Sequence, residues 1–283
     1  MPTIAVVAPG AMGSAVGKRL VENGARVITL LEGRSEQSAA RAHAADMLAA
    51  SLSEIAEADL VLSILPPAEA VRFAKTLAPA LSASKAKPPY IDCNAINPDT
   101  MQKVIAALHG TGCEVIDASI IGGPPVPGRA GPTFYVSGDE NHRADILGKH
   151  GLRLRRIDGP AGAASALKMV YGGLNKGTIA LQTAMLLAAD RAGCGESLRQ
   201  ELSESMPQVL GRMSRAIPDM YPKAYRWVAE MEEIAAFLGA GDPAAQMFKA
   251  NAEIFTAMTK DREGEHRYAR ILDGLLGRQK SPS

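Results

Sequence analysis

Short β-branched segments alternate with amphipathic segments from the N-terminus to residue 158, and this alternation limits the fold more than any other feature of the sequence. It is typical of βαβ units around a parallel sheet. The first segments are almost wholly apolar, as in strands covered on both faces. We therefore expect an α/β, doubly wound sheet with strands at Thr3–Val7, Arg26–Leu31, Leu60–Leu65, Tyr90–Cys93, Glu114–Ala118, Thr133–Ser137 and Leu152–Ile157. Helices are expected between them at Met12–Asn23, Glu36–Leu48, Ala68–Leu81 and Asp99–Leu108.

The strand pattern stops near Pro160. The stretch Ala161–Ala192 contains no proline and predicts one long helix, which Gly193 would end. Further helical patterns follow, separated by prolines. We predict an α/β domain over residues 1–159 and an all-α domain over residues 160–283. The second domain would begin with the long helix and serve substrate binding and dimerisation.

Composition narrows the class of protein. A chain of 283 residues suits two domains, and a net charge of +1 offers no basic face for nucleic acid or a membrane surface. No apolar run reaches the ~18 residues of a membrane span, and no secretory signal pattern opens the chain. The three cysteines and five histidines lack metal-ligand or disulfide spacing. We expect a cytoplasmic protein without a metal, a nucleic-acid partner or a membrane.

A glycine turn follows the first expected strand. Ala8-Pro9-Gly10-Ala11-Met12-Gly13 has the G-x-G-x-x-G spacing with alanine at its first position. Gly10 would let the backbone approach a pyrophosphate, and Gly13 would allow close contact between helix and strand. The strand before the turn and the helix after it are the context that this motif requires. We predict a Rossmann domain that binds a dinucleotide at Gly10, Ala11, Met12 and Gly13.

The end of the second expected strand selects the dinucleotide. The sequence there is Leu31-Glu32-Gly33-Arg34-Ser35. An acidic residue at this place holds the ribose 2′-hydroxyl of NAD, whereas an arginine accommodates the 2′-phosphate of NADP. Arg34 can donate two hydrogen bonds to a phosphate, and Ser35 can add a hydroxyl or cap the next helix. We expect NADP(H) to be preferred, with NAD(H) as the alternative that Glu32 favours.

Four segments together resemble the β-hydroxyacid dehydrogenase superfamily, which includes 3-hydroxyisobutyrate dehydrogenase and 6-phosphogluconate dehydrogenase. They are Gly10–Gly13, Leu65-Pro66-Pro67, Asp117–Gly123 with its Gly131-Pro132-Thr133 continuation, and Gly162–Lys168. The resemblance implies that the chain runs beside the nicotinamide at Leu65 and Pro66. It also places Asn94, in the loop Asp92–Pro98, beside the nicotinamide ribose or the substrate, although Asn is equally a common turn residue.

The same resemblance implies a reaction. A carbon that bears a hydroxyl gives hydride to the nicotinamide while Lys168 takes the hydroxyl proton, or the reverse in reduction. Lysine suits this role when burial or nearby positive charge brings its pKa towards the working pH. The alanine-rich surroundings of Lys168 predict such burial. The expected substrate is a small hydroxy acid or carbonyl compound.

Three positions depart from the family pattern. Ile121 replaces the serine before the double glycine, which in the family helps to hold the substrate carboxylate, although the backbone N–H groups of Gly122 and Gly123 can still meet an anion. The expected substrate-binding residues of this loop are Ser119, Ile121, Gly122 and Gly123. Gly172 replaces the asparagine four residues after the lysine, and Tyr171 either supplies the lost hydrogen bond or packs. Asn175 replaces the glutamate acid of 6-phosphogluconate dehydrogenases. Since an amide gives up no proton at neutral pH, we expect a non-decarboxylating enzyme.

Two alternatives remain open. The loss of the serine at Ile121 favours an imine reductase-like enzyme, and the departures at Ile121 and Gly172 together leave a non-catalytic dinucleotide-binding protein as the other alternative. The apolar surface of Ala161–Ala192 exceeds what a small helical domain needs to cover, which predicts a homodimer through that domain. A helix over Arg226–Ile234 either packs in the second domain or presents a glutamate or Trp227 to the substrate pocket.

Overall fold

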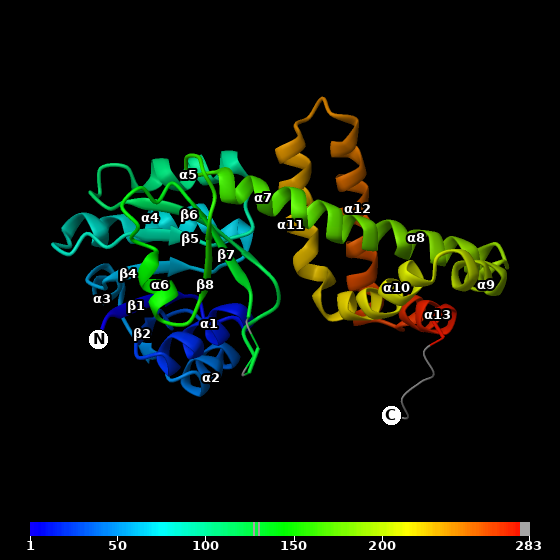
Figure 1. Ribbon diagram of the computed structural model, residues 1–283, viewed down its shortest axis with the longest axis horizontal. Helices are drawn as coiled ribbons and strands as arrows, with labels where there is room; N and C mark the ends of the chain where they lie inside the picture. The colour runs from blue at the N-terminus through cyan, green and yellow to red at the C-terminus, as the bar shows by residue number, and fades with distance from the viewer. Residues whose placement is uncertain (127, 130, 278–283) are drawn as a thin grey trace. The chain divides into compact units, whose positions relative to one another are not determined.

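The computed structural model describes residues 1–126, 128–129 and 131–277 (Figure 1). The chain divides into two compact units, the first from Met1 to Met169 and the second from Val170 onward. The sequence placed the boundary at residue 159, before the long helix, whereas this division falls inside it. Residues 278–283 of the expected helical domain lie outside the described residues.

The first unit is built on one eight-stranded sheet of order β3-β2-β1-β4-β5-β6-β7-β8. Neighbouring strands are parallel except β6 and β7, which are antiparallel. The α/β doubly wound sheet expected from the sequence is therefore confirmed. The strands are β1 (Thr3–Val7), β2 (Arg26–Thr29), β3 (Leu48–Ala49), β4 (Leu60–Ser63), β5 (Tyr90–Asp92), β6 (Val115–Ile121), β7 (Thr133–Ser137) and β8 (Arg153–Arg156).

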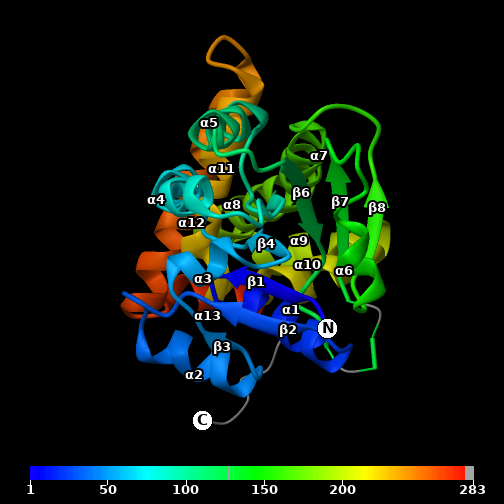
Figure 2. The same cartoon turned by 90° about the vertical axis from the view of Figure 1, so that its left-hand side faces the viewer.

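Helices cover both faces of the sheet. On one face, α1 (Ala11–Glu22), α2 (Glu36–Ala44) and α6 (Asp145–Lys149) share a core with alternate strand residues such as Ile4 and Val6. On the other, α3 (Leu52–Ala56), α4 (Ala70–Ala83) and α5 (Pro98–Leu108) pack on the intervening residues such as Ala5 and Val7. Figure 2 shows α4 and α5 on the side of the strands opposite α1. Strands covered on both faces need no polar alternation, which explains their apolar sequences.

The strand order reverses beside β1. β1 pairs with β2 on one side and with β4 on the other, and Val7 at its end lies opposite Ser63 of β4. In doubly wound sheets the crevice outside the carboxyl ends of the strands, at this reversal, is where ligands bind. The glycine turn after β1 and the Leu65-Pro66 segment after β4 therefore meet at one edge of the sheet.

Some short elements were not expected. The helix expected over Glu36–Leu48 ends at Ala44, and Leu48–Ala49 instead pairs with β2 as an edge strand. The five-residue helices α3 and α6 also escaped the periodicity, since five residues hold little more than one turn. The start of α3 did carry a local signal, because Ser51 and Glu54 form a capping box.

The long helix expected over Ala161–Ala192 is observed as three successive helical segments. The helix α7 (Ala163–Gly172) leads into a π-helical turn, η2 (Gly173–Gly177), and then into α8 (Thr178–Arg191). π-Turns inside α-helices are rare and frequently occur at functional sites. The glycines suit the turn because a side chain at Gly173 would press on the Phe248 ring, 3.1 Å from its Cβ position.

The second unit is entirely helical in its described residues. Its core includes Trp227 of α11 (Ala224–Leu238), whose ring meets that of Phe255 in α12 (Pro243–Glu263) edge to face at 5.2 Å between centroids. Trp227 is thus buried in the packing of its own unit. After α8 the elements are α9 (Gly195–Ser205), α10 (Pro207–Met220), η3 (Tyr221–Lys223), α11 (Ala224–Leu238), α12 (Pro243–Glu263) and α13 (Arg267–Leu275). Of the helices in the described ranges, none combines the length and apolar character needed to cross a bilayer.

Candidate cofactor and catalytic site

The glycine turn packs as the motif requires. A Cβ at Gly13 would overlap the carbonyl oxygen of Ala8, so the first turn of α1 lies directly on the end of β1. Gly10 caps α1 in an extended conformation, with φ of −71° and ψ of −174°, and a Cβ there would meet no atom within 4 Å. The chain therefore needs glycine at position 13 for packing, whereas at position 10 it leaves open space beside the backbone.

The N-terminus of α1 offers donors for an anion. Ala11, Met12 and Gly13 occupy the first turn, where backbone N–H groups lack partners within the helix. Within the described residues, this turn has no capping side chain and contains no acidic residue. The positive end of the helix dipole is therefore not neutralised locally, and it fits a pyrophosphate group.

The turn after β2 presents Arg34. The turn closes through a hydrogen bond from Arg34 N to Leu31 O at 3.0 Å, with Gly33 at a φ of +69°. Arg34 is half-buried, and its guanidinium makes no hydrogen bond or ion pair with the part of the chain that the structure describes. The Ser35 hydroxyl caps α2 by accepting from Ser38 N at 3.3 Å, the capping role that the sequence suggested. Arg34 is thus the available cation at this edge, whereas Ser35 is partly engaged.

Asn94 joins the ends of β4 and β5. It is 2% exposed, and its Oδ1 accepts from Leu65 N at 2.5 Å. Its Nδ2 donates to Ser63 Oγ at 3.0 Å and to Asp92 Oδ2 at 2.9 Å. Both amide hydrogens are therefore used within the protein. This placement lets Asn94 fix the backbone of Leu65, which, like Pro66 after it, is expected beside the nicotinamide.

Asp92 and Cys93 lie buried next to this asparagine. Burial raises the pKa of Asp92 to about 7, the hydrogen bond from Asn94 N opposes the rise, and the charge of Asp117 adds to it. Burial also raises the pKa of the Cys93 thiol, with Asp92 and Asp117 contributing in the same direction. Cys93 is therefore a neutral core thiol. Asp92 is a carboxyl that takes up a proton close to neutral pH.

Ser119 was expected to bind substrate, but it lies in the sheet interior. It is fully buried, and its hydroxyl donates to Ala164 O in the first turn of α7 at 2.7 Å. A role in holding α7 fits this placement better than a contact with a ligand. Further along the loop, Ile121 is half-buried and Gly123 is exposed with open space at its Cβ position. Gly122 has a φ of +125°, and a Cβ added there would lie 3.0 Å from the Cα of Pro132.

Lys168 lies on α7 above the end of β6. Its half-buried side chain donates from Nζ to Ile120 O at 2.5 Å. The positive charge of Lys168 partly offsets the rise in the pKa of Cys93, the residue that directly follows β5. Lys168 therefore lies at the carboxyl end of β6, in the same unit and at the same edge of the sheet as the glycine turn. An amine at this place could take or give a proton.

The other two residues expected in catalysis lie in the second unit. Tyr171 is 49% exposed on α7. Asn175 lies in the π-helical turn, and its Oδ1 accepts from Arg212 at 2.9 Å. The next residue, Lys176, pairs with Glu230 of α11 and lies over the Trp227 ring at 5.4 Å. The pairing of Arg212 with Asn175 and of Lys176 with Glu230 was not expected, since pairs 37 and 54 residues apart leave no spacing signal.

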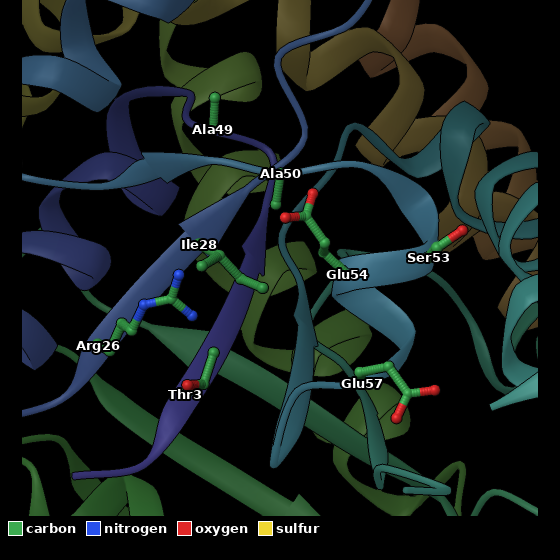
Figure 3. A pocket seen from close by; sticks show the side chains of 8 residues that line it. All are labelled: Thr3, Arg26, Ile28, Ala49, Ala50, Ser53, Glu54 and Glu57. Carbon is green, nitrogen blue, oxygen red and sulfur yellow. The ribbon is translucent and has the colours of Figure 1, made fainter. Parts of the chain in front are cut away.

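A separate pocket of about 330 Å³ lies at the amino ends of β1 and β2 (Figure 3). Figure 3 shows Arg26 on the strand side and Glu54 and Glu57 on the side of α3. Glu54 already accepts from Ser51 in the capping box, which lowers its pKa. Since doubly wound sheets bind ligands at the opposite, carboxyl ends of their strands, this pocket is not the site.

A sheet that reverses order beside an open glycine turn and an uncapped helix N-terminus defines a dinucleotide-binding protein of the Rossmann class. Residues 3–148 match the model of the NAD binding domain of 6-phosphogluconate dehydrogenase, and residues 189–258 match a domain of unknown function, DUF1932. The chain belongs to the β-hydroxyacid dehydrogenase superfamily and carries a helical C-terminal domain, as the resemblance implied.

Individual relatives agree with this family. A probable 3-hydroxyisobutyrate dehydrogenase from Mycobacterium bovis is 31% identical over 141 residues, which cover 50% of this chain and 47% of the relative. The match thus spans about half of that relative. The structure of Mycobacterium tuberculosis 3-hydroxyisobutyrate dehydrogenase with L-serine superposes with a TM-score of 0.72 at 23% identity, covering 97% and 99% of the two chains. An imine reductase from Myxococcus stipitatus in complex with NADP⁺ gives 0.52 at 16% identity, covering 97% and 100%. These two structures share the fold.

Proposed function

We propose that this protein is an NADP(H)-dependent oxidoreductase of the 3-hydroxyacid dehydrogenase type. Hydride passes from the hydroxyl-bearing carbon of a small hydroxy acid to the nicotinamide, the hydroxyl proton passes to Lys168, and a carbonyl is left; reduction runs the other way. The observation that carries the proposal is the position of Lys168, whose Nζ is held on Ile120 O at the same sheet edge as the glycine turn. Lys168 is the general acid/base, and the dinucleotide supplies the hydride chemistry.

The preference for NADP(H) over NAD(H) rests on Arg34. Its guanidinium has no partner in the described structure and follows the strand whose end selects the dinucleotide. A 2′-phosphate would accept its paired donors, which suit phosphate oxygens. The N–H groups of Ala11, Met12 and Gly13 hold the pyrophosphate, and Gly10 leaves room for it. Leu65 and Pro66 lie beside the nicotinamide, and Asn94 fixes the backbone of Leu65 from within the protein.

The substrate is a small hydroxy acid that keeps its carboxyl group. Asn175 stands where decarboxylating relatives carry an acid, and its oxygen is engaged by Arg212. Gly122 and Gly123 meet the substrate through backbone N–H groups, while Ile121 adds an apolar wall. The relatives named for 3-hydroxyisobutyrate, and the one bound to L-serine, make these compounds the first substrates to test.

The test follows nicotinamide absorbance with NADP⁺ or NAD⁺ and 3-hydroxyisobutyrate or L-serine. We expect turnover with NADP⁺, a loss of about 100-fold or more for Lys168→Ala, and normal rates for Lys103→Ala, an exposed lysine of α5. Dinucleotide binding without turnover of any hydroxy acid, carbonyl or imine would support a non-catalytic dinucleotide-binding protein instead.

Imine reduction is the second candidate function, and Ile121 is the observation that favours it. An apolar residue at the place of a carboxylate-binding serine suits a substrate without an acid group. The fold shared with an NADP⁺-bound imine reductase is compatible with this reaction. Turnover of a cyclic imine such as 1-pyrroline by NADPH, with no turnover of hydroxy acids, would select it.

We also propose a homodimer through the helical unit, in the cytoplasm. Val170, Leu174, Leu181 and Met185 are exposed apolar residues, and the pairs Val170/Leu174 and Leu181/Met185 are each four residues apart, which places the members of each pair on one helical face. Exposed apolar surface of this kind usually marks an interface. Light scattering should give twice the mass of the chain, and Leu181→Glu should halve it. A monomeric wild type at micromolar concentration would reject the dimer.

A further inference from the structure

Asp117 is a buried carboxylate that the proposed reaction does not use. It lies in the middle of β6 at 0% exposure, opposite Asp92 on one side and Ser137 on the other. Its Oδ2 accepts from Gly162 N at 2.8 Å, from Ser165 N at 2.9 Å and from Ser137 Oγ at 3.1 Å. Its Oδ1 accepts from Ser165 Oγ at 2.7 Å. One carboxylate therefore receives four hydrogen bonds, three of them from the start of α7.

These bonds hold the first turn of α7 against the sheet. N–H groups at a helix start lack partners within the helix and are normally met by a local capping side chain. Here strands β6 and β7 meet them, because Ser137 Oγ also accepts from Ala164 N at 3.0 Å. Ser119 Oγ in turn donates to Ala164 O at 2.7 Å. The depth and the rotation of the helix are thus set by side chains of two strands.

Lys168 follows Ser165 by three residues, so the two side chains lie on the same face of α7. Asp117 holds Ser165, and Ile120 O, three residues further along β6, holds Lys168 Nζ. The helix and the strand are therefore joined twice over a single turn. Any rotation or lift of the helix start would draw Nζ away from the Ile120 carbonyl.

We propose that Asp117, with Ser137 and Ser165, is a positioning residue that places Lys168 for proton transfer. The inference rests on the proposed function, since it gives Lys168 its role there. Displacing a reacting group by about 1 Å can cost about 100-fold in rate. Asp117 touches neither substrate nor cofactor in this scheme. It acts through the helix that carries Lys168.

The test reads Lys168 directly and needs no substrate. Acetic anhydride is applied to the whole protein over a range of pH, and mass spectrometry of the Lys168 peptide gives the pH at which its amine becomes reactive. The double variant Ser137→Ala/Ser165→Ala removes two hydroxyls without changing charge. Because the carbonyl bond favours the ammonium form, its loss should move the Lys168 profile to lower pH by about half a unit or more. The single variant Ser165→Thr keeps a hydroxyl at position 165, so its Lys168 profile should stay close to that of the wild type.

Asp117→Asn is the stronger variant, and Asp139→Asn is its matched control. Asp139 is also a buried carboxylate that accepts N–H bonds at a helix start, from Arg143 at 2.7 Å and Ala144 at 3.1 Å. Asp117→Asn should lower kcat about 100-fold with little change in the Kd for NADPH, and Asp139→Asn should change neither. Asp117→Asn also removes a charge near Asp92, Cys93 and Lys168. The double variant Ser137→Ala/Ser165→Ala leaves the charge unchanged, so its result decides when the two variants disagree or when Asp117→Asn does not fold.

An unchanged Lys168 profile in the folded double variant would overturn the positioning role. So would equal effects of Asp117→Asn and Asp139→Asn on kcat at matched thermal stability. The failure of the proposed function looks different. A protein that turns over no substrate but shows the shifted Lys168 profile would reject the function while confirming that Asp117 and its two serines place the lysine.

Discussion

A methyl group at Gly13 would overlap the carbonyl oxygen of Ala8, whereas one at Gly10, three residues earlier, would meet nothing within 4 Å. The two glycines of one motif therefore differ in what they do. Gly13→Ala should lower the free energy of unfolding by about 1–3 kcal/mol, because the contact between α1 and β1 cannot form unchanged. Gly10→Ala should cost less than about 1 kcal/mol in stability but should weaken NADPH binding about 10-fold or more, because its Cβ occupies the space of the pyrophosphate.

Urea unfolding and NADPH fluorescence titration measure these two effects separately. Gly24→Ala would be a poor comparison because of its positive φ, so Gly123→Ala, at another open position, is the control for stability. The distinction between the glycines would be wrong if Gly10→Ala unfolded the protein while Gly13→Ala remained as stable as the wild type.

Asp92 should make stability depend on pH near neutrality. Its pKa is about 7 in the folded protein, against an ordinary value of 3.8. Below the ordinary value both states are protonated and Asp92 contributes nothing. As the pH rises towards 7 the unfolded state ionises first, so the folded state loses stability, by at most about 1.4 kcal/mol per pH unit from this group. Above pH 7 the loss is complete.

The measurement is the free energy of unfolding at several pH values for the wild type and Asp92→Asn. The variant should show a flatter pH dependence, while Asp99→Asn, at an exposed position on α5, should follow the wild type. Identical slopes for the wild type and Asp92→Asn would show that Asp92 is ionised in the folded protein throughout this range.

Lys176 and Glu230 form a partly buried ion pair in the helical unit. Their side chains are 12% and 18% exposed, and the lysine also lies over Trp227. Removing one partner leaves the other charge without its counterpart, so Glu230→Gln and Lys176→Met should each lower stability by about 1–3 kcal/mol, between the values for exposed and for fully buried pairs. The double variant should lose less than the sum of the two. Strict additivity in thermal or urea unfolding would contradict a direct interaction.

The sequence predicted the features that local patterns encode. The apolar runs predicted the sheet, and the glycine turn predicted the edge where a dinucleotide binds. The proline-free stretch before Gly193 predicted the long helix. Short elements were missed, because the two-residue strand β3 and the five-residue α3 and α6 are too short for a period to show. The helix over Ala161–Ala192 was expected to be regular, and only packing around Phe248 reveals the π-helical turn in its middle.

The hydrogen bonds that hold the residues of the candidate site in place could not be predicted from the sequence. Asp117 and Ser165 are 48 residues apart, and Asn94 and Leu65 are 29 apart, so no local spacing links them. Ser119 illustrates the consequence. The motif placed it in the substrate loop, but in the strand its side chain faces α7, because alternate residues of a strand point to opposite faces. Motifs identify the residues, whereas the packing decides which of them face a ligand.

The most direct test of the central claim is a titration of the purified protein with NADPH and with NADH, followed by nicotinamide fluorescence, beside Arg34→Ala. We expect NADPH to bind more tightly than NADH and Arg34→Ala to weaken NADPH about 10- to 100-fold, the worth of a charge-assisted bond to phosphate, with little change for NADH. Equal weakening of both would place Arg34 away from the 2′-phosphate. Binding of neither dinucleotide would contradict the proposal that this chain is a nicotinamide-dependent oxidoreductase.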